Sequence, residues 1–239
     1  MEKTKNVWVD LHNNDESWRK KIVGDISEVF VVPRYVKLFY SYFEKASQLE
    51  FLEIGSGTAD ISRQIITQNK GQIKRYVLSE HFQEGVDWLK NKGFEAYQVN
   101  ALDIPFPNQS YDVVVEFDVM HHVSDPRKMA FEMMRVSRGK LLMVESNGFS
   151  IFRKLMELTP GHRAAGEKSF TPQQWKSFFE NHQCFQLTKF EIFPFLFPFR
   201  VPRFLLSTLV KFNHLIEKIP FFRWQCSSVA IYIEFNSNK

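Results

Sequence analysis

The chain has 239 residues, of which 44% are hydrophobic and 24% charged, an ordinary composition that excludes a disordered, collagen-like or coiled-coil protein. The length predicts one domain with a sizeable core, and a formal net charge of +4 is too small to indicate nucleic-acid binding. The two cysteines, Cys184 and Cys226, lack the spacing of a CxxC pair and indicate neither a disulfide framework nor a zinc site.

Residues 1–50 are predicted to form a helical cap, because Val32, Val36, Phe39 and Phe43 recur at helical spacing, with an interruption at Pro33. The first residues are charged and lack the apolar stretch of a signal peptide. No run of about 18 apolar residues follows. We therefore expect a cytoplasmic protein.

From Phe51 the pattern changes to short apolar runs separated by amphipathic segments, which predicts strands alternating with helices and a parallel sheet buried on both faces. After Ser146 a polar loop is expected, and then a helix with Thr171 as N-cap and Pro172 at N1. A strand over 187–193 and a final strand over 228–235 complete the predicted sheet.

The most informative stretch is FLEIGSGTAD, residues 51–60, an apolar strand that enters a glycine turn and then a helix. Gly55 and Gly57 allow a sharp turn and close approach of a ligand to the main chain. A dinucleotide fingerprint needs a third glycine where Ala59 stands, so that template fails. Glu53, inside the strand, suits a cation or an amine better than a pyrophosphate.

A second acid lies at the end of the next predicted strand. Glu80 follows Gly57 by 23 residues, where a carboxylate can accept two hydrogen bonds from ribose hydroxyls. An acid at a helix start is the alternative interpretation. Phe82 could lie on a purine face.

The third element is residues 100–126, NALDIPFPNQSYDVVVEFDVMHHVSDP. With it, the chain resembles the class I S-adenosylmethionine-dependent methyltransferases of the small-molecule type, over about residues 50–192. The resemblance implies S-adenosylmethionine as cofactor and S-adenosylhomocysteine as product. It assigns cofactor contacts to Glu53, Ile54, Gly55, Ser56, Gly57, Glu80, His81, Phe82, Asn100, Ala101, Leu102, Glu116, Phe117 and His121.

Two residues depart from the family pattern. Ala59 replaces a glycine and narrows the space at the helix start. Asn100 replaces an aspartate, and its amide oxygen can still accept from an adenine amino group. The family fold is α/β, a Rossmann-like doubly wound sheet of seven mostly parallel strands with an antiparallel last strand. A single domain over 1–239 is expected, with a cap (1–50), a cofactor-binding core (51–193), an aromatic lid (194–227) and a final strand segment (228–239).

Three polar residues at the ends of the fourth and fifth strands are the catalytic candidates. His121 or His122 could act as general base toward a hydroxyl acceptor, oriented by Glu145. Packing or helix capping by the two histidines is the alternative. No metal ligand set is predicted.

The loop TPGHRAAGEKSFT after the fifth strand places His162, Arg163 and Lys168 where the family holds its acceptor. These side chains could recognise a sugar, carboxylate or phosphate. A solvated loop is the alternative.

Phenylalanine is concentrated in the C-terminal part of the chain: nine of the 25 precede Asn147, and sixteen lie between Phe149 and Phe235. Residues 194–227 combine a proline-spaced aromatic segment with an amphipathic helix over 203–219. A packed lid, an apolar acceptor pocket and peripheral membrane contact through residues 194–224 all remain open.

The predicted activity is transfer of a methyl group to a small-molecule or lipid- or glycan-linked acceptor, preferably at oxygen. The alternatives are a quinone or isoprenoid acceptor and a non-catalytic cofactor-binding module. No nucleic-acid partner is expected, the oligomeric state stays open, and membrane contact would place the enzyme at the inner membrane surface.

Overall fold

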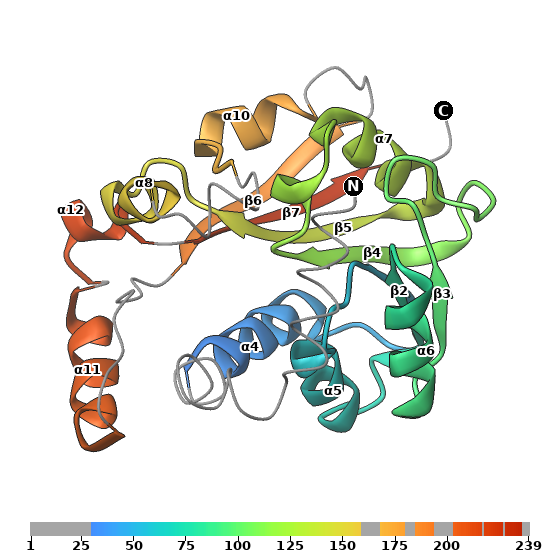
Figure 1. Cartoon of the computed structure of the whole chain (residues 1–239), viewed down its shortest axis with the longest axis horizontal. Helices are drawn as coiled ribbons and strands as arrows, with labels where there is room; N and C mark the ends of the chain where they lie inside the picture. Colours follow the sequence, from blue (N-terminus) through green and yellow to red (C-terminus); the bar gives the residue numbers. More distant parts are fainter. Residues whose placement is uncertain are drawn as a thin grey trace.

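A seven-stranded sheet organises the computed structural model of the chain, which describes residues 30–158, 168–179, 185–193, 203–216, 218–226 and 228–235 (Figure 1). The strand order is β3-β2-β1-β4-β5-β7-β6, and only β7 runs antiparallel to its two neighbours. The strands are β1 (Leu49–Ile54), β2 (Ile73–Glu80), β3 (Ala96–Gln98), β4 (Tyr111–Phe117), β5 (Ser137–Ser146), β6 (Phe185–Phe193) and β7 (Ser228–Phe235). The predicted Rossmann-like α/β sheet, with its antiparallel last strand, is confirmed.

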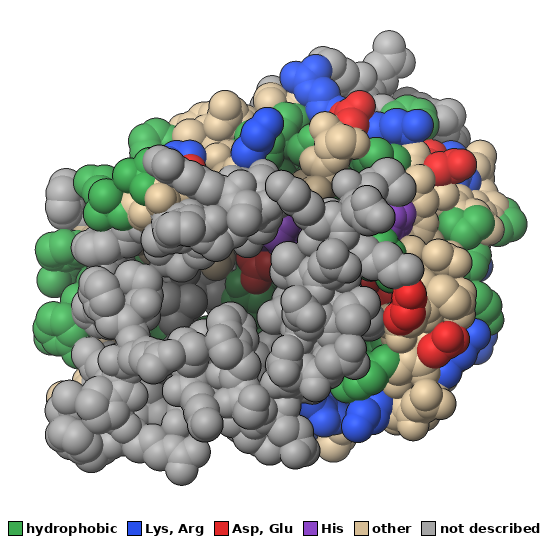
Figure 2. All heavy atoms as spheres, in the orientation of Figure 1, with side chains coloured by type: hydrophobic (Ala, Val, Ile, Leu, Met, Phe, Trp, Pro, Cys, Tyr) green, Lys and Arg blue, Asp and Glu red, His purple; other side chains and the backbone are tan. Residues whose placement is uncertain are grey.

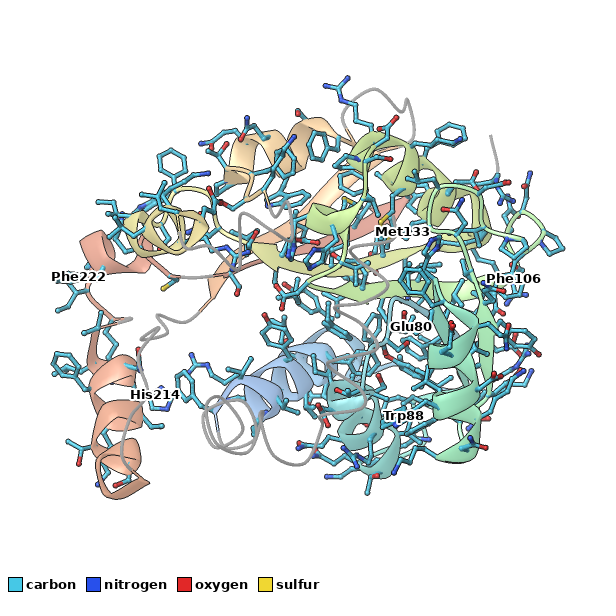
Figure 3. The ribbon with its side chains drawn as sticks, viewed as in Figure 1. Glu80, Trp88, Phe106, Met133, His214 and Phe222 are labelled. Atoms are coloured by element: carbon cyan, nitrogen blue, oxygen red, sulfur yellow. The ribbon has the colours of Figure 1, made fainter. Side chains whose placement is uncertain are left out.

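Helices cover the two faces of the sheet in separate layers (Figure 1). One layer consists of α4 (Val32–Phe43), α5 (Asp60–Thr67) and α6 (Gln83–Asn91), and the other includes α7 (Pro126–Val136) and α10 (Pro172–Ser177). Trp88 of α6 and Met133 of α7 lie on opposite sides of the strands (Figure 3).

Alternate residues of the central strands supply the two cores. Phe51 and Val113 pack with the α4 layer, whereas Leu52 and Val114 pack with the α7 layer, and all four are 0% exposed. Strands buried on both faces explain the continuous apolar runs in the sequence.

The start of α10 follows the predicted capping chemistry, and the start of α7 also has a side-chain cap. Thr171 forms a capping box with Gln174 at the start of α10, and the Asp125 side chain accepts from the Lys128 amide at the start of α7.

Three local predictions need correction. Pro33 does not interrupt a helix but lies in the first turn of α4, where its missing N–H costs no hydrogen bond. The expected polar loop after Ser146 contains a further helix, α8 (Ile151–Glu157). The helix from Arg203 ends at Ile216 rather than 219, and α12 (Pro220–Arg223) follows it.

The proposed segment boundaries stay predictions. Residues 1–29 of the cap and 194–202 of the insertion lie outside the described residues. In the described chain, no helix combines the length and apolar character needed to cross a bilayer.

The α4 layer depends on aromatic packing around Phe39, which is 0% exposed and contacts the rings of Phe43, Phe51 and Tyr76. We expect Phe39→Ala to lower the free energy of unfolding by about 3–5 kcal/mol, because it leaves a cavity in the core. Urea denaturation measures this loss. The matched control is Phe131→Ala, at a side chain 51% exposed on α7, where a change within about 1 kcal/mol is expected.

Candidate active site

The candidate residues of the first five strands meet at one edge of the sheet. Because β1 to β5 are parallel, their carboxyl ends lie side by side, and each contributes polar groups there. The contributions are Gly55, Ser56 and Gly57 after β1, Glu80 at the end of β2, Asn100 to Leu102 after β3, Glu116 and Phe117 at the end of β4, and Glu145 in β5. Ligands of open α/β sheets bind at such an edge.

The loop after β1 is built on left-handed backbone. Gly55 and Gly57 have φ of +68° and +53°. A Cβ at position 55 would lie 2.8 Å from Val119, whereas nothing lies within 4 Å of a Cβ at position 57. The main chain at Gly57 therefore faces open space. Ala59 also has positive φ, 54°, which explains why a glycine suits this position.

Glu80 links β2 to this loop. Its carboxylate accepts hydrogen bonds from the Gly57 amide, 2.5 Å from Oε1, and from the His81 amide, 3.2 Å from Oε2. Burial raises the pKa of Glu80, while the two amides act in the opposite direction. His81 is exposed and its ring lies 4.8 Å from that of the half-buried Phe82.

The Glu53 carboxylate is directed into the protein. It is 3% exposed and accepts hydrogen bonds from the hydroxyls of Ser62 and Tyr76 at 2.7 Å. Burial raises its pKa to about 7, opposed by these two hydroxyls. Glu53 therefore braces the strand, the following helix and β2, and a contact with a bound amine would need this network to open. Ile54 is likewise buried.

Beyond β3, Asn100 is exposed and its Oδ1 accepts from the Leu102 amide at 3.0 Å. This bond fixes the loop that carries the half-buried Ala101 and Leu102. The side-chain oxygen expected to meet an adenine is therefore already engaged by the main chain.

Glu145 organises the catalytic candidates. Its Oε2 lies 2.7 Å from Nδ1 of His121, in the short helix η2 (Met120–His122), and accepts from the Ser146 amide. Its Oε1 accepts from the amides of Met120 and His121. The buried carboxylate is 0% exposed, so these donors compensate its charge.

The His121 ring is held by this bond. Burial opposes its charged form, but the hydrogen bond and charge of Glu145, together with the charge of Asp118, raise the His121 pKa above 6.5. Donation from Nδ1–H to Glu145 leaves Nε2 as the acceptor. His122 is exposed, and its ring lies 4.0 Å from that of His121.

Glu116 lies behind this pair rather than in an open pocket. It is 0% exposed, its Oε2 accepts from the Val119 amide, and its carboxyl group lies within hydrogen-bonding distance of the Glu145 side chain. Burial and the charge of Glu145 raise the Glu116 pKa well above its usual range, which favours the protonated form. Phe117 is 8% exposed and packs against the Tyr35 ring.

Two residues at this edge, Tyr35 and Asp118, are not among the predicted site residues. Tyr35 of α4 donates to Asp118 Oδ2 at 2.9 Å and lies 3.3 Å from the Ser228 hydroxyl. Asp118 is exposed, but surrounding protein atoms and the charge of Glu145 raise its pKa to about 6, opposed by His121 and Tyr35. The position of Asp118 directly after a strand could have indicated it. No sequence signal brings Tyr35 there.

Acidic and histidine side chains are visible near one another in a hollow of this face (Figure 2). One donor atom each from Asp118, His121 and Glu145 lies within 4.8 Å of the others, a separation that a metal ion could bridge. Protein N–H groups already occupy both oxygens of Glu145. We therefore assign this group to hydrogen bonding.

The proposed acceptor residues are only partly described. Lys168 is exposed, whereas His162 and Arg163 lie outside the described residues. Their role stays a prediction.

Residues 52–143 match the family model of a methyltransferase domain. The matched segment covers less than half of the chain, and over that segment the chain is similar to methyltransferase domains. Two proteins that are similar to this chain are named as S-adenosylmethionine-dependent methyltransferases, and the similarity implies S-adenosylmethionine as the cofactor.

Comparisons with individual proteins agree with this similarity. A protein of Mycobacterium tuberculosis named "probable S-adenosylmethionine-dependent methyltransferase" is 43% identical over 53 residues, which span 22% of this chain and 19% of that relative. A candidate methyltransferase from Bacillus halodurans has a TM-score of 0.62 at 15% identity, covering 84% of this chain and 99% of its own. A methyltransferase from Archaeoglobus fulgidus has a TM-score of 0.60 at 14% identity, covering 87% and 94%.

The residues of the segment that matches the family model fit S-adenosylmethionine at two points. The open space beside Gly57 leaves room for a ligand against the main chain, and the Glu80 carboxylate lies next to it as an acceptor. The fit at Glu53 and Asn100 is less direct, because both side chains have protein partners.

Alanine substitutions in the glycine loop separate backbone strain from crowding. We expect Gly57→Ala to cost about 1–2 kcal/mol of unfolding free energy, from the left-handed backbone alone. Gly55→Ala should cost more, because its Cβ also meets Val119. Urea denaturation of both variants tests this order, and equal losses would contradict it.

Proposed function

We propose that the chain transfers the methyl group of S-adenosylmethionine to a hydroxyl group of a small-molecule or lipid- or glycan-linked acceptor. The observation that carries the proposal is the bond between His121 Nδ1 and Glu145 Oε2 at the carboxyl edge of the sheet. It presents an oriented imidazole at the edge where the cofactor is expected.

The chemistry follows from this orientation. The cofactor, when bound, supplies a methyl group activated on a sulfonium. With the cofactor bound, the acceptor oxygen would form a bond to the methyl carbon as the carbon–sulfur bond breaks, and His121 Nε2 would take the hydroxyl proton. Glu145 holds the ring in the required tautomer and stabilises the imidazolium.

The acidic groups around His121 also suit this reaction. Glu145 and Asp118 are carboxyl groups near the ring and favour its positive charge. Tyr35 fixes Asp118 through a hydrogen bond at 2.9 Å. A negative field at the edge would attract a cationic cofactor as well.

For the acceptor we propose only a chemical class, a hydroxyl-bearing small molecule, lipid or glycan. A quinone or isoprenoid acceptor remains the second candidate, favoured by the exposed apolar side chains of the C-terminal helices such as Phe212 and Leu215. A polar acceptor would instead be bound by Lys168, His162 and Arg163.

His121 and Glu145 can be tested through the pH dependence of methyl transfer. A base must be unprotonated, so turnover should fall as the pH drops through a midpoint above 6.5, since the His121 pKa is raised. Glu145→Gln removes the negative charge that raises this pKa and should move the midpoint to lower pH. His121→Gln should reduce kcat about 10²- to 10⁴-fold.

The assay follows transfer of a labelled methyl group to hydroxyl-bearing lipids and glycans, with cofactor affinity measured by calorimetry to establish folding. His214→Gln on α11 is the control for loss of a histidine. Unchanged turnover of His121→Gln at saturating substrate would disprove the base role, and loss of the acidic limb only in His122→Gln would transfer that role to His122.

The cofactor assignment has a separate test. Glu80→Gln keeps one oxygen for the Gly57 amide but removes a charge and an acceptor, so the affinity for S-adenosylmethionine should fall about tenfold or more. Asp87→Asn, at an exposed position of the neighbouring helix α6, should leave it unchanged. No calorimetric binding of the cofactor by the unmodified protein would disprove the proposed function.

A further inference from the structure

In the part of helix α11 whose side chains the structure describes, two large apolar side chains are exposed. Asn213 is buried at 4% exposure, and His214 points toward α4, where its ring contacts Arg34 and Phe30 (Figure 3). Phe212 and Leu215 are 48% and 60% exposed. A surface helix normally buries its apolar stripe, so the exposure of these two side chains is unusual.

Further apolar side chains adjoin this helix. We call the apolar edge the set of exposed residues Ile151, Leu155, Leu158, Phe212, Leu215 and Trp224. Their helices α8, α11 and α12 lie along one side of the molecule, where hydrophobic atoms gather at its margin (Figures 1 and 2).

Specific contacts join the parts of the apolar edge. The Trp224 ring lies 6.0 Å from that of Phe149, and Gln225 Oε1 accepts from the Ile151 amide at 2.8 Å. Asn147 donates to the Trp224 carbonyl at 3.0 Å. Because Asn147 follows Glu145 by two residues, the apolar edge is attached directly to the strand that orients His121.

The charges beside the apolar edge have one predominant sign. Residues 203–224 contain four Lys or Arg residues and one acid, Glu217. Lys211 and Lys218 are both exposed: Lys211 adjoins Phe212 in α11, and Lys218 adjoins Ile219 in the segment between α11 and α12. Exposed aromatic and aliphatic groups next to cations characterise helices that lie in a membrane interface.

We propose that the apolar edge docks on an anionic lipid surface. The 14 residues of α11 are too few to span a bilayer, so the helix would lie in the interfacial plane, with Trp224 at the level of the headgroups. Excess positive charge on this surface attracts anionic lipid, whereas the same surface of a second copy of this chain would be repelled. Docking would bring the carboxyl edge of the sheet to acceptors held in the membrane.

Vesicle co-sedimentation tests the docking surface without any methyl transfer, and therefore independently of the proposed function. The unmodified protein should bind vesicles of phosphatidylcholine with phosphatidylglycerol more strongly than vesicles of phosphatidylcholine alone. Phe212→Gln combined with Leu215→Gln should weaken binding about tenfold or more, because the interface loses two apolar side chains.

The matched control is Phe131→Gln, at a similarly exposed aromatic residue of α7 outside the apolar edge, which should bind as the unmodified protein does. Lys211→Gln combined with Lys218→Gln should remove the preference for anionic vesicles. Unfolding temperature and cofactor affinity establish that each variant folds.

Two results would overturn the proposal. One is absence of binding to anionic vesicles by the unmodified protein. The other is light scattering that shows a dimer of the unmodified protein and a monomer of the Phe212→Gln, Leu215→Gln variant, since a second copy would then cover the edge.

Discussion

The arrangement of the carboxyl edge depends on compensation of one buried charge. Glu145 has no exposed surface, and removal of a carboxylate from water is costly unless donors replace the lost hydration. Three amides and the His121 ring supply them. Because two of those amides belong to η2, the same bonds that stabilise the carboxylate fix the turn after β4 and the orientation of the imidazole. The geometry of the candidate site and the local fold therefore depend on the same hydrogen bonds.

Much of the fold could be predicted from the sequence, because its signals are local. The glycine turn at Gly55, the cap at Thr171 and the alternation of apolar runs each predict a structure from neighbouring residues alone, and the structure contains all three. The pairing of His121 with Glu145 was also accessible, since both follow strand ends that a parallel sheet brings together.

What the sequence could not provide depends on packing between distant segments. The periodicity of residues 203–219 predicts an amphipathic helix but not which way it faces. In the structure His214 contacts Arg34 of α4, and Phe212 and Leu215 are exposed. The inward direction of Glu53 likewise requires Ser62 and Tyr76, whose positions follow from the packing of α5 and β2. The sequence pattern thus predicts the type of an element, whereas the direction of its side chains depends on the segments that pack against it.

The hydroxyl of Tyr35 reaches both Asp118 and Ser228, residues separated from it by 83 and 193 positions. One end of this contact is formed by an early helix and the other by the last strand of the sheet. During synthesis β7 leaves the ribosome after the other six strands, so this hydrogen-bonded junction can close only after β7 has emerged. A nascent chain can already hold the glycine loop and β2, yet Tyr35 meets its second partner only with the final strand in place.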